Sequence, residues 1–137
     1  MRYWLVKSPF RTRSWQDVLI KGTFKLYGIR NHQARNNIKQ MQSGDNVLYY
    51  HGPSGKQIYG IMQVKNEAYP DPITNAPTWL AIDFEPVKTL DTPITLSQIK
   101  ALPELQDIGL IKQPRLSVIS ISKKEFDTLL LTVPGDY

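Results

Sequence analysis

Short segments in which apolar and polar residues alternate are the feature that most limits the fold of this chain. Such alternation is typical of strands with one buried face. The expected strands cover residues 2–7, 46–51, 57–68, 79–90 and 115–121. Short helical segments separate them without the regular strand–helix–strand order of a parallel sheet. The pattern predicts an α+β fold in which five or six mostly antiparallel strands form a small closed or nearly closed barrel with short flanking helices.

Capping signals predict where three of these helices begin. Ser14, Thr95 and Ser122 each stand three residues before an acid or a glutamine, which is the spacing of a capping box. The predicted helices therefore start at residues 15, 96 and 123 and pack short apolar faces against the strands.

A further helix is expected after Asn31, because asparagine is a good N-cap. Ala34, Ile38 and Met41 then fall at the spacing of one apolar stripe, which would face the core. Gly28 gives the chain before the cap the freedom to turn.

The polar faces of this helix are unusual. Asn31 and Arg35 lie on one side of the apolar stripe, and Gln33 and Asn37 lie on the other. Asn costs about 0.6 kcal/mol relative to Ala inside a helix, which argues for a role of Asn36 and Asn37 other than solubility. Amide and guanidinium groups suit planar, bidentate recognition, so this helix is either a solvated face or a polar recognition surface.

The segment Gly28–Asn37 resembles the motif G-[VI]-R-N-x-Q-A-R-N of the EVE domain family. Other matching segments are residues 3–8, 44–51, 67–71 and 115–118. Because they span nearly the whole chain in the family's order, the resemblance implies one EVE domain over residues 1–137 with a PUA-like pseudobarrel. It also implies a reader of modified nucleobases, either modified cytosine in DNA or a modified base in RNA.

Two positions depart from the family pattern. Many relatives have a glutamate between the serine and the proline of the first motif, whereas this chain reads Lys7-Ser8-Pro9. Many also have Trp-Asp-Gly where this chain reads Leu26-Tyr27-Gly28. Tyr27 could replace the missing aromatic ring.

Positive charge is concentrated in the first part of the chain. Residues 1–40 contain nine Lys or Arg and one acid, whereas the chain as a whole has a net charge of +5. This excess indicates a polyanionic partner, since cations that neutralise phosphates release counterions. The alternative is that these side chains are spread over different faces of the folded protein.

Composition excludes several classes of site. The chain has no Cys, and its histidines, His32 and His51, are far apart, so no zinc-binding spacing occurs. No catalytic or nucleotide-binding motif, and no apolar run long enough for a membrane span, is present. We therefore expect no catalytic residue, no metal, no cofactor and no membrane partner, and a cytoplasmic location, with a monomer favoured.

A flipped base needs aromatic walls, polar groups for its edge and cations for the flanking phosphates. The candidate base-pocket residues are Ser14, Trp15, Tyr27, Arg30, Asn31, Gln33, Arg35, Asn36, Tyr50, His51 and Asp71. The candidate phosphate-binding residues are Lys7, Arg11, Arg13 and Lys39. Trp79 is a further possible wall, and each aromatic residue, Trp15 above all, could instead belong to the core.

Two other functions remain open. ASCH-like relatives of the same barrel include nucleases, and such an enzyme could use Lys7, Tyr69 or Asp71. The second of these two functions is a sensor of small nucleosides.

Overall fold

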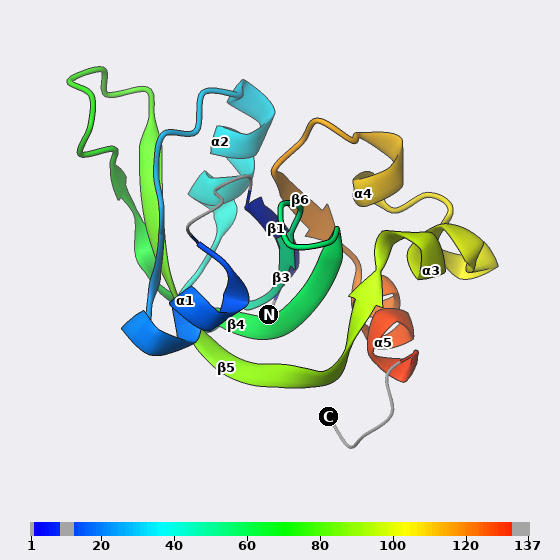
Figure 1. Cartoon of the computed structure of the whole chain (residues 1–137). Coiled ribbons are helices and arrows are strands. Elements are labelled where there is room, and N and C mark those ends of the chain that lie inside the picture. The colour runs from blue at the N-terminus through cyan, green and yellow to red at the C-terminus, as the bar shows by residue number, and fades with distance from the viewer. Residues whose placement is uncertain (1, 9–12, 133–137) are drawn as a thin grey trace.

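A curled six-stranded sheet forms the frame of the computed structural model, which describes residues 2–8 and 13–132. The strands are β1 (Tyr3–Ser8), β2 (Phe24–Leu26), β3 (Asn46–His51), β4 (Gln57–Pro70), β5 (Leu80–Thr95) and β6 (Val118–Ile121). The helices are α1 (Trp15–Lys21), α2 (His32–Gln40), α3 (Leu96–Ala101), α4 (Gly109–Lys112) and α5 (Lys123–Leu131), with a 3₁₀ turn at Pro103–Leu105. Figure 1 shows β4 and β5 bending into a half-barrel, which confirms the predicted α+β fold.

The strand order is β2-β5-β4-β3-β1-β6, so β1 lies between β3 and β6. It pairs in parallel with β3 and antiparallel with β6, whereas the other pairs are antiparallel. Trp4, Leu5 and Val6 are each fully buried, and because successive side chains of a strand point to opposite faces, both faces of β1 are covered. The parallel pairing brings the C-terminal ends of β1 and β3 to the same edge of the sheet.

Register shifts give β4 and β5 their curvature. One shift lies between Ile58 and Gly60, where the missing side chain makes room for the indole of Trp15. A Cβ at Gly60 would lie 2.1 Å from Cζ2 of Trp15. Irregular pairing of this kind bends strands and closes barrels. Gly60 therefore lies at a bend of β4 and also makes room for α1 to pack through Trp15.

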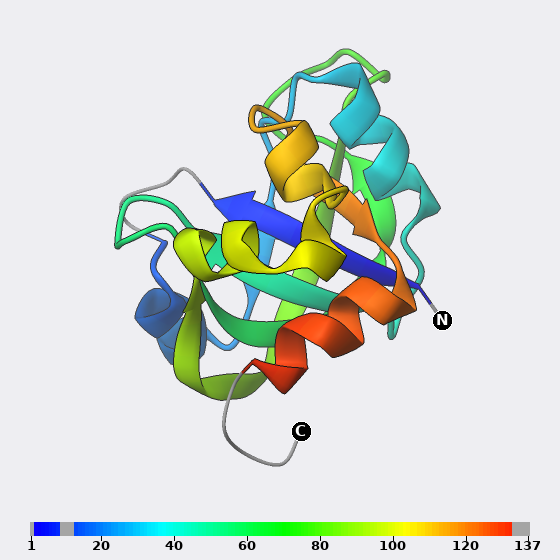
Figure 2. The ribbon, with the colours of Figure 1, turned by 90° about the vertical axis from the view of Figure 1, so that its right-hand side faces the viewer.

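The helices begin where the capping signals predicted. Ser14, Thr95 and Ser122 form complete capping boxes, and the side chain of Asn31 accepts a hydrogen bond from the Ala34 amide at 2.9 Å. The expected apolar stripe of α2 is buried against the sheet. Figure 2 shows α5 across one face of the molecule, with α2 at the far end of the sheet. No helix among the described residues is long and apolar enough to cross a membrane.

Four elements differ from the expectation. The edge strand β2, the 3₁₀ turn and α4 have only three or four residues each and carry too little pattern to predict. Strand β5 continues past Leu90 to Thr95 although it contains Pro86 and Pro93. Beyond Phe84 this strand pairs with β4 alone, and proline is tolerated where one side of a strand has no partner.

Candidate functional site

Two adjoining hollows lie where α2, β1, β3 and the segment before β6 meet. The first has a volume of about 300 Å³ and is lined by Lys7, Ser8, Tyr50, Gly52, Arg115, Leu116 and Ser117. The second has a volume of about 370 Å³ and is lined by Asn31, Gln33, Gln113, Pro114, Arg115 and Leu116. Because they share Arg115 and Leu116, we call the two together the groove.

The topology explains why distant segments meet here. In the parallel pair β1 and β3, Lys7 lies opposite Tyr50, and Ser8 lies opposite His51. The segment before β6 is joined to β1 through the Lys7 amide, which donates to the Ser117 carbonyl at 2.8 Å. Asn37 of α2 donates from its side-chain nitrogen to the Val118 carbonyl at 2.8 Å, so α2 is fixed beside the same segment.

Lys7 closes the inner part of the groove. Its ammonium group donates to the Pro114 carbonyl at 2.6 Å and lies 5.8 Å from the centre of the Tyr50 ring. Burial lowers the pKa of Lys7 and raises that of Tyr50. Tyr50 is only 4% exposed, so it forms the floor here rather than a free aromatic wall.

The outer part of the groove carries polar groups with free hydrogen-bonding capacity. Gln33 and Arg115 are exposed, and among the described residues their side chains make no hydrogen bond or ion pair. An amide offers both donors and acceptors, and a guanidinium offers a planar fork of donors. The groove can therefore bind a planar polar group together with an anion.

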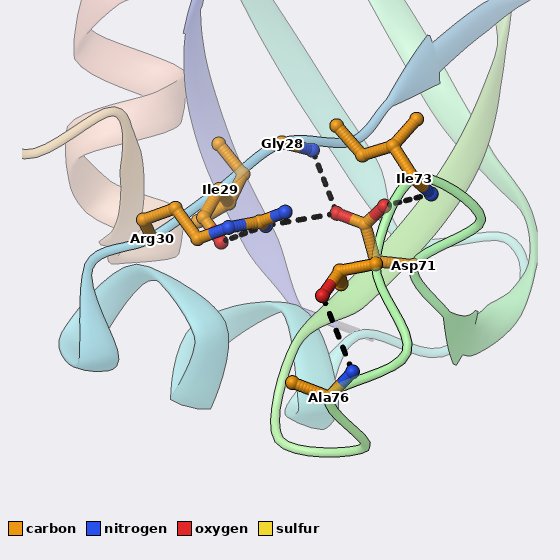
Figure 3. Close-up of polar contacts among 7 residues, drawn as sticks. Gly28, Ile29, Arg30, Asp71, Ile73 and Ala76 are labelled. Atoms are coloured by element: carbon orange, nitrogen blue, oxygen red, sulfur yellow. Dashed lines mark hydrogen bonds and ion pairs between the residues drawn. The ribbon is translucent and has the colours of Figure 1, made fainter.

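Asp71, predicted as an acceptor for a base, does not line the groove. Figure 3 shows its carboxylate holding the loop before α2. Oδ2 accepts from the Gly28 amide at 2.8 Å and from Nη1 of Arg30 at 3.0 Å, and Oδ1 accepts from the Ile73 amide at 2.8 Å. Gly28 has φ of 78°, which turns its amide toward Asp71 at little cost for a glycine.

The electrostatics of Asp71 fit this structural role. Its side chain is fully buried, and burial alone would raise its pKa. The hydrogen bonds from Ile73 and Gly28 and the Arg30 guanidinium outweigh that effect, so the pKa of Asp71 is lowered. Arg30, half-exposed, is therefore held in place by Asp71 and is not simply a free cation.

The indole beside α2 is that of Trp79, and Trp15 is a core residue. Trp79 lies 4.9 Å from the His32 ring and 5.5 Å from the Arg30 guanidinium. Trp15 is 6% exposed, lies 5.6 Å from the Tyr49 ring and donates from Nε1 to Thr89 at 2.9 Å. Trp15, predicted as a wall of the base slot, does not line the groove.

His51 and Ser14 also have structural positions. His51 is 1% exposed, stacks on Tyr49 at 6.3 Å and has Nδ1 2.6 Å from Oγ of Ser54. Ser14 caps α1 by accepting a hydrogen bond from the Asp17 amide at 3.2 Å. Neither side chain lines the groove, although the backbone of β3 places His51 next to Tyr50.

Tyr27 and Arg13 lie together in a separate hollow of about 260 Å³, which we call the α1 cleft. It is lined by Arg13, Asp17, Val18, Lys21, Thr23, Phe24, Lys25 and Tyr27. Lys39 lies in a third hollow with Arg2, at the opposite end of α2 from Asn31. The early cations are thus divided among several places, and Arg11 falls outside the described residues.

The other α2 residues differ in their surroundings. Asn36 is exposed and lines neither hollow of the groove. Arg35 is half-buried, and its Nε atom is buried without a hydrogen-bond partner among the described residues. Asn31 and Gln33 are therefore the α2 side chains that reach the groove.

Arg115 is the main site residue that sequence reasoning missed. It belongs to the segment 115–118, which supported the resemblance, but its place in the chain gives no sign that it meets the start of α2.

The three residues named for a nuclease do not gather in one site, so the structure adds no support for that alternative. Asp71 is fully buried, Tyr69 donates to Asp83 at 2.6 Å, and Lys7 lies in the groove. Residues 2–8 and 13–132 contain no cluster of three His, Asp or Glu side chains that could hold a metal ion.

Comparison with known proteins gives consistent matches over nearly the full length. The EVE domain model matches residues 2–131. Human thymocyte nuclear protein 1 is 26% identical over 162 residues, covering 93% of this chain and 72% of that protein.

Two solved structures extend the match to three dimensions. The NMR structure of Rpa0253 from Rhodopseudomonas palustris is 38% identical with a TM-score of 0.91, covering 97% of this chain and 93% of that one. The crystal structure of human THYN1 in complex with 5-methylcytosine-containing DNA is 26% identical with a TM-score of 0.89 and covers 100% of both chains. With the family model matched from β1 to the end of α5, the chain belongs to the EVE domain family.

Proposed function

We propose that this protein binds nucleic acid and recognises one chemically modified base in the groove. The observation that carries the proposal is the meeting of Gln33, Arg115 and Lys7 in one concave site built from four chain segments. This combination of an amide, a guanidinium and an ammonium group suits the edge of a base and the phosphates beside it.

The size of the groove supports a ligand of this class. Its hollows, of about 300 and 370 Å³, lie at the lower end of the range of about 300–1,000 Å³ for small-molecule sites. One extruded base could enter, with Gln33 at its polar edge and Tyr50 beneath it. Arg115, shared by both hollows, would neutralise the phosphate of the flipped nucleotide.

The human THYN1 structure makes 5-methylcytosine the first modification to test, because that relative was solved with DNA containing this base. Modified bases in RNA remain a second arm of the same test. The protein is proposed to be a reader and not an enzyme, so an oligonucleotide incubated with it and Mg²⁺ should stay intact and unmodified. The cytoplasmic location and the monomeric state stay predictions.

Fluorescence anisotropy can test the proposal with oligonucleotides that differ in one base. Single- and double-stranded DNA and RNA carrying cytosine, 5-methylcytosine or thymine (uracil in RNA) at one position would be compared at one salt concentration. We expect tighter binding to a modified strand. We expect Gln33→Ala to remove most of the preference for a cytosine-type base over thymine, because cytosine and 5-methylcytosine present the same hydrogen-bonding edge and thymine presents a different one. A well-placed bidentate contact contributes about 1–3 kcal/mol to base discrimination, which corresponds to about 5- to 150-fold.

Variants of nearby residues make the test specific. Arg115→Ala should weaken binding to modified and unmodified strands by similar factors, as expected for a phosphate contact. Asn36→Ala is the matched control, because Asn36 is an exposed α2 amide that does not line the groove. A preference for cytosine-type bases over thymine that survives Gln33→Ala, or a base preference that is lost with Asn36→Ala, would contradict the assignment of the groove.

A further inference from the structure

The α1 cleft has its own pattern of charge, separate from the groove. Three cations, Arg13, Lys21 and Lys25, line a hollow of about 260 Å³ that contains one acid, Asp17. Oδ2 of Asp17 accepts hydrogen bonds from the amide and the hydroxyl of Ser14, each at 3.0 Å. Asp17 is thus engaged in capping α1, and the cleft is left with a surplus of positive charge.

Arg13 is held in position before any ligand arrives. Its Nη1 donates to the Lys25 carbonyl and its Nη2 donates to the Tyr27 hydroxyl, both at 2.5 Å. The guanidinium carbon lies 4.6 Å from the centre of the Tyr27 ring and 5.5 Å from that of Phe24. A cation fixed in this way loses little side-chain entropy when an anion binds beside it.

Lys21 and Lys25 extend this charge toward solvent. Both are exposed, and neither forms an ion pair within the described part of the chain. Asp83, opposite Lys25 on β5, instead accepts a hydrogen bond from Tyr69 at 2.6 Å. Two exposed ammonium groups next to a fixed guanidinium suit the oxygens of a phosphate.

The cleft and the groove lie within reach of one elongated ligand. Figure 2 shows α1, the end of β1 and the loop after β3 on the same side of the molecule. Tyr27 lines the cleft and Asn31 lines the groove. Four residues of extended chain span at most about 14 Å, and nucleic acid advances about 3.4 Å per nucleotide along a duplex strand.

We infer that the α1 cleft is a second contact site for nucleic acid, where Lys21, Lys25 and Arg13 hold backbone phosphates about four nucleotides from the base in the groove. The inference rests on the proposed function. It adds that full affinity needs a strand that extends beyond the recognised nucleotide. Lys21 and Lys25 should contribute affinity and salt dependence without contributing to the choice of base.

The test compares the double variant Lys21→Ala/Lys25→Ala with the control Lys100→Ala/Lys124→Ala. The control removes two exposed lysines from α3 and α5, outside both sites. Replacing Lys25 by Ala leaves intact its backbone carbonyl, which accepts from Arg13. Thermal unfolding by circular dichroism would establish that both double variants are folded.

Affinity would be measured over a range of salt concentrations for modified oligonucleotides of about 4 and about 16 nucleotides. For the longer one, Lys21→Ala/Lys25→Ala should reduce the slope of log affinity against log salt by about 1.4 to 1.8, which is two contacts at about 0.7 to 0.9 each. The slope for the short oligonucleotide and the preference for the modified base should not change. The control should keep the wild-type slope.

The possible failures are distinguishable. Wild-type protein that does not prefer the modified base contradicts the proposed function. A wild-type preference combined with equal slopes for the two double variants contradicts the cleft inference alone. A third experiment titrates the protein with inorganic phosphate and follows the NMR shifts of the Lys21, Thr23 and Lys25 amides. If phosphate saturates these shifts while oligonucleotide affinity does not depend on length, the cleft is a site for a free anion and the inference is overturned.

Discussion

At the scale of single residues, Asp71 illustrates how one buried carboxylate can position the loop before α2. We expect Asp71→Asn to lower the free energy of unfolding by about 1–3 kcal/mol, because at least one of its backbone donors would lose a charged acceptor. Urea unfolding at neutral pH would measure the loss. Glu85→Gln, a change of an exposed carboxylate on β5, should shift stability by less than about 0.5 kcal/mol.

The pH dependence of the Asp71 variant follows from its lowered pKa. The stability that the carboxylate provides is fully present above the ordinary pKa of 3.8 and is lost as the pH falls through the lower folded value. The difference between wild type and Asp71→Asn should therefore shrink as the pH falls below about 4. A difference that stays constant down to the acid transition would contradict the assigned role of the charge.

Gly60 gives a second prediction at this scale. Gly60→Ala would place a methyl group 2.1 Å from Cζ2 of Trp15, so the indole or β4 must move. We expect a loss of about 1–3 kcal/mol, as for other overpacked cores, and a change in tryptophan fluorescence. Gly52→Ala is the control, since a Cβ there meets nothing within 4 Å and its stability should change little.

At the scale of elements, the two adjacent asparagines of α2 have different roles. Asn37 donates to the Val118 carbonyl at 2.8 Å and so joins α2 to β6, whereas Asn36 is exposed. Asn37→Ala should destabilise the protein by about 1 kcal/mol, and Asn36→Ala should stabilise it by up to about 0.6 kcal/mol through helix propensity. Equal effects of the two changes in thermal unfolding would contradict this distinction.

The same helix shows what the sequence can and cannot predict. The N-cap at Asn31 and the buried stripe of Ala34 and Ile38 follow from local patterns, because spacing along a helix determines which side chains share a face. The role of Asn37 depends on β6, some 81 residues away, and no local pattern contains it. Trp15 and Trp79 likewise cannot be assigned from sequence, since Gly60 decides the position of one and His32 that of the other.

At the scale of the whole molecule, the groove depends on sheet topology. Alternation predicted the strands, but the parallel pairing of β1 with β3 determines that Lys7 and Tyr50 lie side by side. The antiparallel pairing of β6 with β1 then places Arg115 next to both. Positive charge is concentrated in residues 1–40 of the sequence, but folding divides it among the groove, the α1 cleft and the third hollow that contains Arg2 and Lys39.

The stability of the whole molecule at high pH should depend on Tyr49, which is fully buried among Trp15, Phe24 and His51. Its hydroxyl donates to the Arg13 carbonyl, and burial raises the pKa of Tyr49 from 10.0 to about 12. Between these values the unfolded chain loses the tyrosine proton while the folded protein keeps it, so the unfolded state becomes more favourable. This tyrosine alone should lower the free energy of unfolding by up to about 1.4 kcal/mol per pH unit above pH ~10.

Urea unfolding of wild type and Tyr49→Phe between about pH 8 and about pH 11 would isolate this contribution. Tyr49→Phe loses a hydrogen bond and should be less stable at pH ~8, but its stability should fall less steeply above pH ~10, so the two curves converge. Parallel stability curves for wild type and Tyr49→Phe would mean that the Tyr49 hydroxyl can ionise without unfolding the barrel. In that case the buried hydrogen bond to the Arg13 carbonyl does not hold the start of α1 against the sheet.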